Sequence, residues 1–172
     1  MKIGILKEEK TPADKRVPLT PAQCKFIEDN FSHISILVKS CKNRCFSDNM
    51  YLEKGINVVD DLEDCDVLLG IKEVPVKALI PNKVYLYFSH IIKEQVYNRD
   101  LLIKMIDLNI RMIDYEVIKD ANGRRLIGFG RFAGIVGAYN TFLTYGLKTS
   151  LFNLKPAYKC YDQNEMKEQL HN

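Results

Sequence analysis

The stretch that decides the fold is VLLGIKEVPVKALIPNKVYLYFSHIIK, which runs from Val67 to Lys93. It contains two short apolar runs, Val67–Ile71 and Val84–Phe88, and neither alternates with polar residues. Continuous apolar runs of this length are typical of strands that are buried on both faces, as in a parallel sheet. Lys72 ends the first run, and His90 follows the second run after one serine. Because parallel strands end at a common edge, where open sheets bind ligands, we expect Lys72 and His90 to face one crevice.

The remainder of the first 130 residues predicts further strands and the helices between them. Similar apolar runs predict strands at Lys2–Leu6, Ile34–Val38 and Ile110–Tyr115. Helical spacing and end signals predict helices over residues 21–30, 47–54 and 94–108 and a short helix or turn over 75–81, and Thr20 with Gln23 has the pattern of a capping box. The turn signal Asn122-Gly123 predicts a short return strand over residues 126–129. Alternating strands and helices predict an α/β fold, with a doubly wound, mostly parallel sheet in a flavodoxin-like three-layer sandwich.

The character of the sequence changes after Gly130. Residues 131–145 predict a helix that is apolar nearly all round, with Gly146 as its C-terminal cap, so we expect it to be buried on more than one side. We therefore divide the chain into an α/β domain over residues 1–130, a helix of interdomain type over 131–150 and a polar tail over 151–172. A short helix is expected within the tail, over residues 165–170.

Composition and charge exclude several classes of function. The formal net charge is only +3, and no dense block of lysine and arginine indicates binding to nucleic acid. No apolar span approaches the ~20 residues that a membrane helix needs. The five cysteines have no metal-ligand spacing, and Cys41 and Cys45 have no histidine near them in sequence, so we expect no metal. Reduced thiols and the absence of a signal-peptide pattern favour the cytoplasm.

Charged groups follow four of the predicted strands. Arg16 lies after the first strand and Glu116 after the last, in addition to Lys72 and His90. Arginine suits a carboxylate, and a lysine and a histidine near acids are suited to exchange protons at neutral pH. The residues therefore predict a site for a carboxylate-bearing small molecule with proton transfer.

The segment GFGRFA, over residues 128–133, matches a dinucleotide-binding pattern. That pattern needs an acidic residue about 20 positions further on, and no acidic residue occurs between Asp120 and Asp162. We interpret the segment as a close-packed entry to the helix that follows.

Five segments together resemble a known family. They are DKRVPLTP around Arg16, GIKEVP around Lys72, YFSHIIK around His90, IDYE ending at Glu116, and GRRLIGFGRFAGIVGAYN from Gly123. In this order and spacing they resemble the N-terminal domain of the alanine dehydrogenase and pyridine nucleotide transhydrogenase superfamily. Within it, the chain is more similar to saccharopine dehydrogenase (lysine-forming) and to the lysine–ketoglutarate reductase part of the bifunctional lysine-degrading enzyme.

The resemblance implies roles for six residues. Lys72 and His90 match the acid–base pair of the family, and Glu73 and Glu116 match the acids that tune this pair. Arg16 matches the arginine that holds a substrate carboxylate, and Arg125 matches an arginine near the site. The implied function is that of the substrate-side domain of an amino-acid dehydrogenase that acts on a CH–NH group.

The resemblance also implies partners that the 172 residues do not contain. In the family, a Rossmann-type domain follows and carries NAD or NADP, and the helix from Arg131 crosses between the two domains. We therefore expect this helix to be covered by such a domain or by a second copy of the chain. We expect the 172 residues alone to be inactive and to bind no nicotinamide tightly, with a small amino acid or 2-oxo acid as the substrate.

Three rival interpretations remain open. The first is an alanine dehydrogenase or transhydrogenase domain with a different substrate. The second is a non-catalytic binding module that stands alone. A thiol or zinc protein is poorly supported by the cysteine spacing.

Overall fold

The computed structural model describes residues 1–11 and 13–171, and the chain divides into two compact units, Met1–Leu126 and Ile127–Asn172. The first unit is called the α/β unit below, and the second is called the helical unit. Each is described separately.

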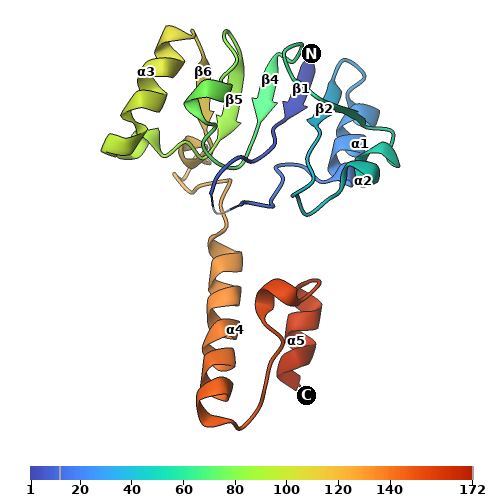
Figure 1. The fold of residues 1–172 in the computed structure, drawn as a ribbon, viewed down its shortest axis with the longest axis vertical. Coiled ribbons are helices and arrows are strands. Elements are labelled where there is room, and N and C mark those ends of the chain that lie inside the picture. The colour runs from blue at the N-terminus through green and yellow to red at the C-terminus, as the bar shows by residue number, and fades with distance from the viewer. Residues whose placement is uncertain (12, 172) are drawn as a thin grey trace. The chain divides into compact units, whose positions relative to one another are not determined.

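Among the described residues of the α/β unit, six strands form one parallel sheet (Figure 1). They are β1 (Lys2–Ile5), β2 (Ser35–Lys39), β3 (Asn57–Val59), β4 (Val67–Leu69), β5 (Val84–Tyr87) and β6 (Arg111–Asp114). Their order across the sheet is β3-β2-β1-β4-β5-β6, and every adjacent pair is parallel. The prediction of a doubly wound parallel sheet is confirmed.

The sequence predicted five of these strands and missed β3 at the edge. Without β3, the spatial order of the remaining five is the flavodoxin order, in which the first strand lies next to both the second and the third. Strand β3 contains only two apolar residues, Val58 and Val59, before an acidic turn. Such a short edge strand depends on pairing with β2 rather than on a recognisable apolar run.

Helices cover both faces of the sheet. One face packs Ile5, Ile36 and Val38 against Cys24 of α1 (Pro21–Asn30) and Tyr51 of α2 (Asp48–Leu52). The other face packs residues of β4 and β5 against α3 (Arg99–Asp107), with a cluster that contains Leu68, Tyr85, Tyr87, Leu101 and Met105. Both faces of the central strands are buried, and this explains the continuous apolar runs in the sequence.

The capping box of α1 is confirmed. The Thr20 side chain accepts a hydrogen bond from the Gln23 amide, and the Gln23 side chain accepts one from the Thr20 amide. The segment over residues 75–81 contains the short 3-10 helix η1 (Val76–Ala78).

Two predictions about the second half of the α/β unit are wrong. The helix predicted over residues 94–108 begins at Arg99, after the 3-10 turns η2 (Ile91–Lys93) and η3 (Val96–Asn98). Glu94 has φ 52°, a left-handed conformation that an α-helix cannot contain. The Asn122-Gly123 turn is present, with Gly123 at φ 77°, but the return consists of one bridge between Lys119 and Arg125, and residues 126–129 form no strand.

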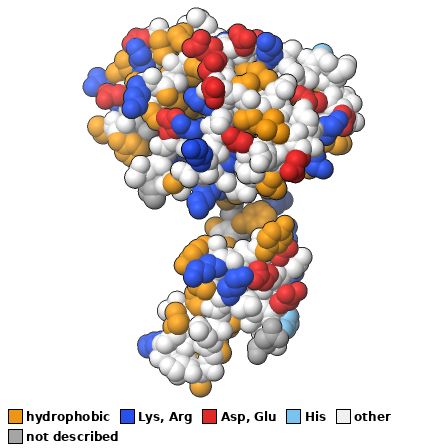
Figure 2. Space-filling model, turned by 45° about the vertical axis from the view of Figure 1, so that its right-hand side comes forward, with side chains coloured by type: hydrophobic (Ala, Val, Ile, Leu, Met, Phe, Trp, Pro, Cys, Tyr) orange, Lys and Arg blue, Asp and Glu red, His pale blue; other side chains and the backbone are white. Residues whose placement is uncertain are grey.

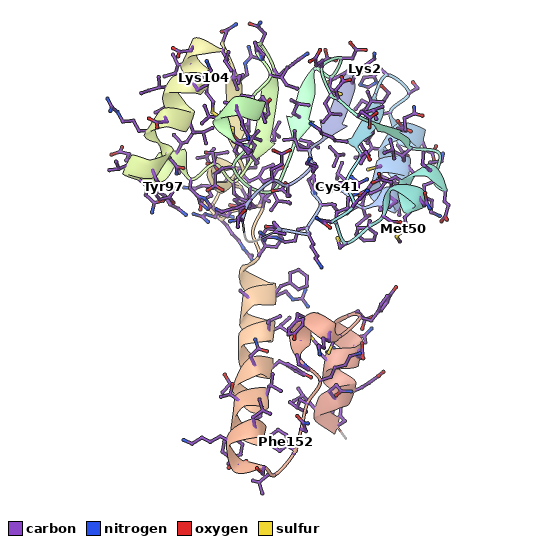
Figure 3. All side chains as sticks on the ribbon, viewed as in Figure 1. Lys2, Cys41, Met50, Tyr97, Lys104 and Phe152 are labelled. Atoms are coloured by element: carbon purple, nitrogen blue, oxygen red, sulfur yellow. The ribbon has the colours of Figure 1, made fainter. Side chains whose placement is uncertain are left out.

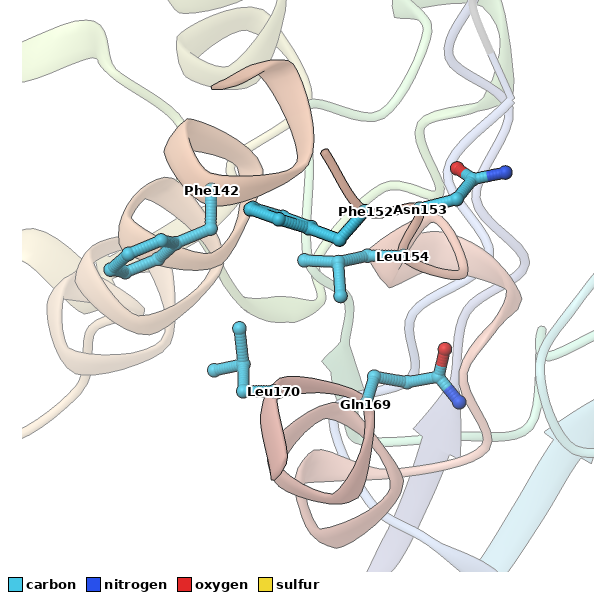
Figure 4. Close-up of a pocket in the computed structure, with 6 residues that line it drawn as sticks. All are labelled: Phe142, Phe152, Asn153, Leu154, Gln169 and Leu170. Carbon is cyan, nitrogen blue, oxygen red and sulfur yellow. The ribbon is translucent and has the colours of Figure 1, made fainter. Parts of the chain in front are cut away.

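The helical unit consists of α4 (Gly130–Thr149), η5 (Ala157–Lys159) and α5 (Gln163–His171). Its small core contains Tyr139, Leu154 and Met166. Figure 4 shows a pocket of this unit, where Phe142, Phe152, Leu154 and Leu170 surround a cavity of 700 Å³. Within the unit, much of the apolar surface of α4 is exposed, including Phe132 and Leu147.

Two predictions about the glycines of the helical unit are also wrong. Gly146 does not cap α4, because the helix continues to Thr149 and Ser150 adopts the left-handed cap conformation. Instead, Gly146 allows close packing, since a Cβ atom there would lie 2.6 Å from the Phe152 carbonyl oxygen. The entry to α4 is not closely packed, since a Cβ atom at Gly128 or Gly130 would meet no atom within 4 Å in the described part of the chain.

No helix among residues 1–11 and 13–171 is long and apolar enough to cross a membrane.

Candidate active site

The predicted site residues follow the carboxyl ends of four adjacent strands. Arg16 lies in the loop after β1, and Lys72 and Glu73 follow β4. His90 follows β5, and Glu116 follows β6. Since the sheet is parallel, all these loops lie at one rim of the α/β unit. In Figure 3, the labelled Cys41 lies at this rim, whereas Lys2, at the start of β1, lies at the opposite end of the sheet.

The rim contains the topological switch point of the sheet, between β1 and β4. The chain leaves β1 toward β2 on one side, and it leaves β4 toward β5 on the other. The last hydrogen bond between the two strands runs from the Leu6 amide to the Leu69 carbonyl, with a length of 2.8 Å. Beyond it the two loops diverge, and in open α/β sheets a crevice of this kind is the usual position of a ligand.

His90 and Glu73 form one pair at this rim. The Nδ1 atom of His90 lies 2.8 Å from Oε1 of Glu73, and the Lys10 ammonium lies 3.1 Å from the other oxygen of the same carboxylate. Burial alone would raise the pKa of Glu73, but the hydrogen bonds from His90 and Lys10 outweigh it and hold this pKa below its usual range. His90 also has φ 56°, an uncommon conformation for a residue other than glycine that often marks functional positions.

Arg16 forms a two-pronged ion pair with Asp14. Its Nε atom donates to one carboxylate oxygen at 2.9 Å and its Nη2 atom to the other at 2.5 Å. The hydrogen bonds from Arg16 hold the pKa of Asp14 below its usual range. The guanidinium is therefore fixed at the rim in a defined orientation, although one of its edges is already engaged.

Glu116 is buried between two cations. Its Oε1 atom lies 3.2 Å from the Lys93 ammonium and 3.1 Å from the Arg125 guanidinium. The other oxygen, Oε2, is buried and has no hydrogen-bond partner in the described part of the chain. Glu116 therefore keeps the Lys93 and Arg125 side chains at the rim.

A buried hydrogen bond connects the loop of His90 to the loop of Glu116. The Ser89 hydroxyl donates to Asp114 at 2.5 Å, and the other oxygen of Asp114 accepts from the Glu116 amide at 2.8 Å. Since these residues are adjacent in sequence to His90 and Tyr115, the two loops are held in one register.

Lys72 differs from the other cations of the predicted site. Its backbone amide donates to Glu8 at 2.9 Å, but its ammonium forms no ion pair with any residue that the structure describes. Asp14 is near enough for Lys72 to help lower the pKa of its carboxylate. Lys72 is therefore a partly buried cation at the switch point, and its charge is available to a ligand.

The structure brings some of the predicted residues into direct contact and leaves others apart. His90 contacts Glu73, and Arg125 contacts Glu116, whereas no contact joins these two pairs to each other or to Arg16 among the described residues. A cavity of 540 Å³ opens at the same rim, lined by residues 7–10, 13–14 and 40–43. It lies between the loops after β1 and β2, and none of the six predicted residues lines it.

Four residues of this rim were not predicted as site residues: Glu8, Lys10, Asp14 and Lys93. All four lie in the same loops after strands as the predicted residues, and this shared position was the signal that could have identified them. The face shown in Figure 2 carries both signs of charge interspersed over the α/β unit. No group of three potential metal ligands occurs among residues 1–11 and 13–171.

Comparison with known proteins identifies the family of this fold and sequence. Residues 4–136 match the family model described as "Alanine dehydrogenase/PNT, N-terminal domain". The chain is 35% identical over 139 residues to alpha-aminoadipic semialdehyde synthase of Arabidopsis thaliana, covering 78% of this chain and 13% of that protein. It is 28% identical over 138 residues to saccharopine dehydrogenase [NAD(+), L-lysine-forming] of Yarrowia lipolytica, covering 77% of this chain and 37% of that protein. The chain thus spans only a minor part of these relatives.

Two solved structures share the fold. L-alanine dehydrogenase superposes with a TM-score of 0.64 at 18% identity, over 85% of this chain and 40% of that one. A transhydrogenase from Sinorhizobium meliloti superposes with a TM-score of 0.66 at 14% identity, over 84% of this chain and 44% of that one. The chain therefore belongs to the alanine dehydrogenase/PNT N-terminal domain family and is homologous to the corresponding segments of saccharopine dehydrogenase and alpha-aminoadipic semialdehyde synthase.

Proposed function

We propose that this chain is the substrate-side domain of a NAD- or NADP-dependent amino-acid dehydrogenase that acts on a CH–NH group, in the manner of saccharopine dehydrogenase. The observation that carries the proposal is the charge arrangement at the switch-point rim. The cations Arg16, His90 and Arg125 each have an internal carboxylate partner, whereas the Lys72 ammonium has no ion-pair partner in the described part of the chain. A site of this kind suits an anionic substrate that undergoes proton transfer.

Lys72 and His90 are the proposed proton-transfer groups. Oxidation of a secondary amine to an imine removes a hydride from carbon and a proton from nitrogen. Water then adds to the imine, and further proton transfers release an amine and a 2-oxo acid. The Glu73 carboxylate fixes the orientation of the His90 ring and supplies a negative charge beside it. Lys72, on the neighbouring loop, is placed to exchange protons with the same substrate.

Arg16 and Arg125 are the proposed carboxylate-binding groups. Each carries a guanidinium, whose geometry matches two carboxylate oxygens. Each is already oriented by an acid of the chain, Asp14 for Arg16 and Glu116 for Arg125. A small amino acid or 2-oxo acid is the substrate class that such an arrangement fits.

The residues at the crevice do not fit a dinucleotide. A pyrophosphate group binds to the free backbone amides of a glycine-rich turn at the start of a helix. Here the amides of Ile71 and Lys72 are occupied by the Glu8 carboxylate, and Glu8, Glu9 and Asp14 place negative charge in the loop after β1. We therefore propose that the nicotinamide cofactor, which accepts the hydride, is held by residues outside these 172. The same reasoning makes the exposed apolar surface of α4 a candidate contact for a Rossmann-type domain or a second copy of the chain.

The five cysteines among the described residues are free thiols. Free thiols support the proposal of a reducing compartment, for which we favour the cytoplasm.

The proposed function is tested with the complete reading frame that contains this chain, expressed as one protein. A substrate panel compares lysine plus 2-oxoglutarate with pyruvate plus ammonia, using NADH and NADPH in turn. We expect turnover with lysine plus 2-oxoglutarate, and we expect Lys72→Met and His90→Gln to lower kcat at least 100-fold while the circular dichroism spectrum is unchanged. Wild-type rates in both variants would refute these roles, and turnover by the isolated 172 residues would refute the proposed division of labour.

A further inference from the structure

Glu8 occupies the point at which β1 and β4 diverge, and neither the sequence patterns nor the proposed reaction uses it. Its Oε1 atom accepts a hydrogen bond from the Ile71 amide at 2.7 Å, and its Oε2 atom accepts one from the Lys72 amide at 2.9 Å. These two amides come directly after the last ladder bond between β1 and β4. One carboxylate therefore continues the pairing of the two strands where the backbone of β1 has turned away.

The opposite side of the same backbone segment is also fixed. The Gly70 amide donates to the Leu86 carbonyl at 2.9 Å, and the Phe88 amide donates to the Ile71 carbonyl at 3.1 Å. The segment from Gly70 to Lys72 is thus held between the end of β5 and the Glu8 carboxylate. Gly70 permits this approach, since a Cβ atom there would lie 3.4 Å from Oε1 of Glu8.

The surroundings of Glu8 connect it to the proposed substrate-binding group. Burial raises the pKa of Glu8 above its usual value, while the two amide bonds and Arg16 act in the opposite direction. The Glu8 carboxylate in turn helps to raise the pKa of Arg16, after the larger effect of the hydrogen bonds to Asp14. Glu8 therefore contacts the backbone of Lys72 directly and acts on Arg16 through its charge.

We propose that Glu8 is a positioning residue that fixes the backbone of Lys72 at the switch point and thereby directs the Lys72 ammonium toward the substrate. Lys72 has no ion-pair partner among the described residues, so the two hydrogen bonds at its backbone are what restrict its root. The inference rests on the proposed function for its catalytic consequence only. The contact itself is a property of these 172 residues.

The contact is tested by amide hydrogen exchange in the 172-residue chain at pH 8, comparing the wild type with Glu8→Gln. A carboxamide offers one acceptor oxygen, and its NH2 group faces the second backbone amide. We expect the exchange rate of at least one of the Ile71 and Lys72 amides to rise tenfold or more, while the Gly70 amide, bonded to Leu86, keeps its rate. The matched control is Glu9→Gln, which removes the same charge from a side chain that pairs with Lys7 at 3.1 Å and should leave all three rates unchanged. Unchanged rates at both Ile71 and Lys72 in Glu8→Gln would overturn the inference.

The catalytic consequence is tested in the complete protein. We expect Glu8→Gln to lower kcat about tenfold, with KM for the carboxylate substrate changed less than twofold, because misplacement of a proton-transfer group slows the chemical step more than it weakens binding. Glu9→Gln should keep the wild-type kcat. An unchanged kcat in Glu8→Gln would overturn the positioning role. If the wild type shows no dehydrogenase activity at all, the proposed function fails, and the exchange rates alone decide whether Glu8 fixes Lys72.

Discussion

The buried carboxylate of Glu116 gives a prediction whose sign can be tested in both directions. Glu116 is 6% exposed, and its two cationic partners, Lys93 and Arg125, are about half exposed. Replacing both cations with methionine leaves the Glu116 carboxylate buried without a counter-charge. Removing the partners of a fully buried charge typically costs 3–5 kcal/mol, and the exposure of both cations reduces this to about 2–3 kcal/mol.

The assay is urea unfolding followed by circular dichroism and by tyrosine fluorescence, since the chain has nine tyrosines and no tryptophan. The Lys93→Met/Arg125→Met variant should lose about 2–3 kcal/mol of unfolding free energy, which corresponds to a fall of roughly 6–9 °C in Tm. Adding Glu116→Gln to this variant should restore stability to within about 1 kcal/mol of the wild type, because the uncompensated charge is gone.

The matched control is Lys25→Met, which removes the cation of an ion pair with Asp29 in which both side chains are about half exposed. This control should change the unfolding free energy by no more than about 0.5 kcal/mol. The reasoning is refuted if the double variant is as stable as the wild type, or if Glu116→Gln destabilises it further.

Three further predictions concern individual contacts. Thr20→Ala should lower the unfolding free energy by about 1 kcal/mol, measured in urea, because it removes an observed N-cap; Thr20→Ser should retain most of it. Gly146→Ala should destabilise the helical unit by about 1–3 kcal/mol, seen as faster amide exchange in α4, because its Cβ atom would clash with Phe152; Gly134→Ala, which meets no atom, is the control. The Asp14–Arg16 pair lowers the pKa of Asp14, so its stabilisation is present above pH 4 and is lost as the pH falls through the lowered value; Asp14→Asn should flatten this part of a pH–stability curve, and an equally steep curve would contradict the assignment.

The fold was predictable because its central strands are buried on both faces. The runs at β4 and β5 read as continuous apolar segments, and the capping box fixed the start of α1 at Pro21. Features that depend on tertiary contacts were not predictable. Strand β3 is too short to have a periodic signal, and Gly146 resembles a helix cap although the approach of Phe152 is what requires a glycine there.

The candidate site shows the same division between position and contact. Parallel topology and the residues after each strand placed Arg16, Lys72, His90 and Glu116 at one rim before any coordinates were known. The pairing of these residues could not be predicted, because side chains from different loops meet only in the folded chain. The Glu8 carboxylate is the clearest case, since it contacts amides more than 60 residues away in sequence.

The central claim is that Arg16, Lys72 and His90 serve one anionic substrate at the switch-point rim. Its most direct test is an NMR titration of the 172-residue chain with 2-oxoglutarate, with side-chain signals of arginine, lysine and histidine observed separately. We expect the signals of Arg16, Lys72 and His90 to shift together along one saturation curve and Lys72→Met to weaken binding at least fivefold. Shifts confined to residues away from this rim, or three independent curves for the three side chains, would contradict the claim.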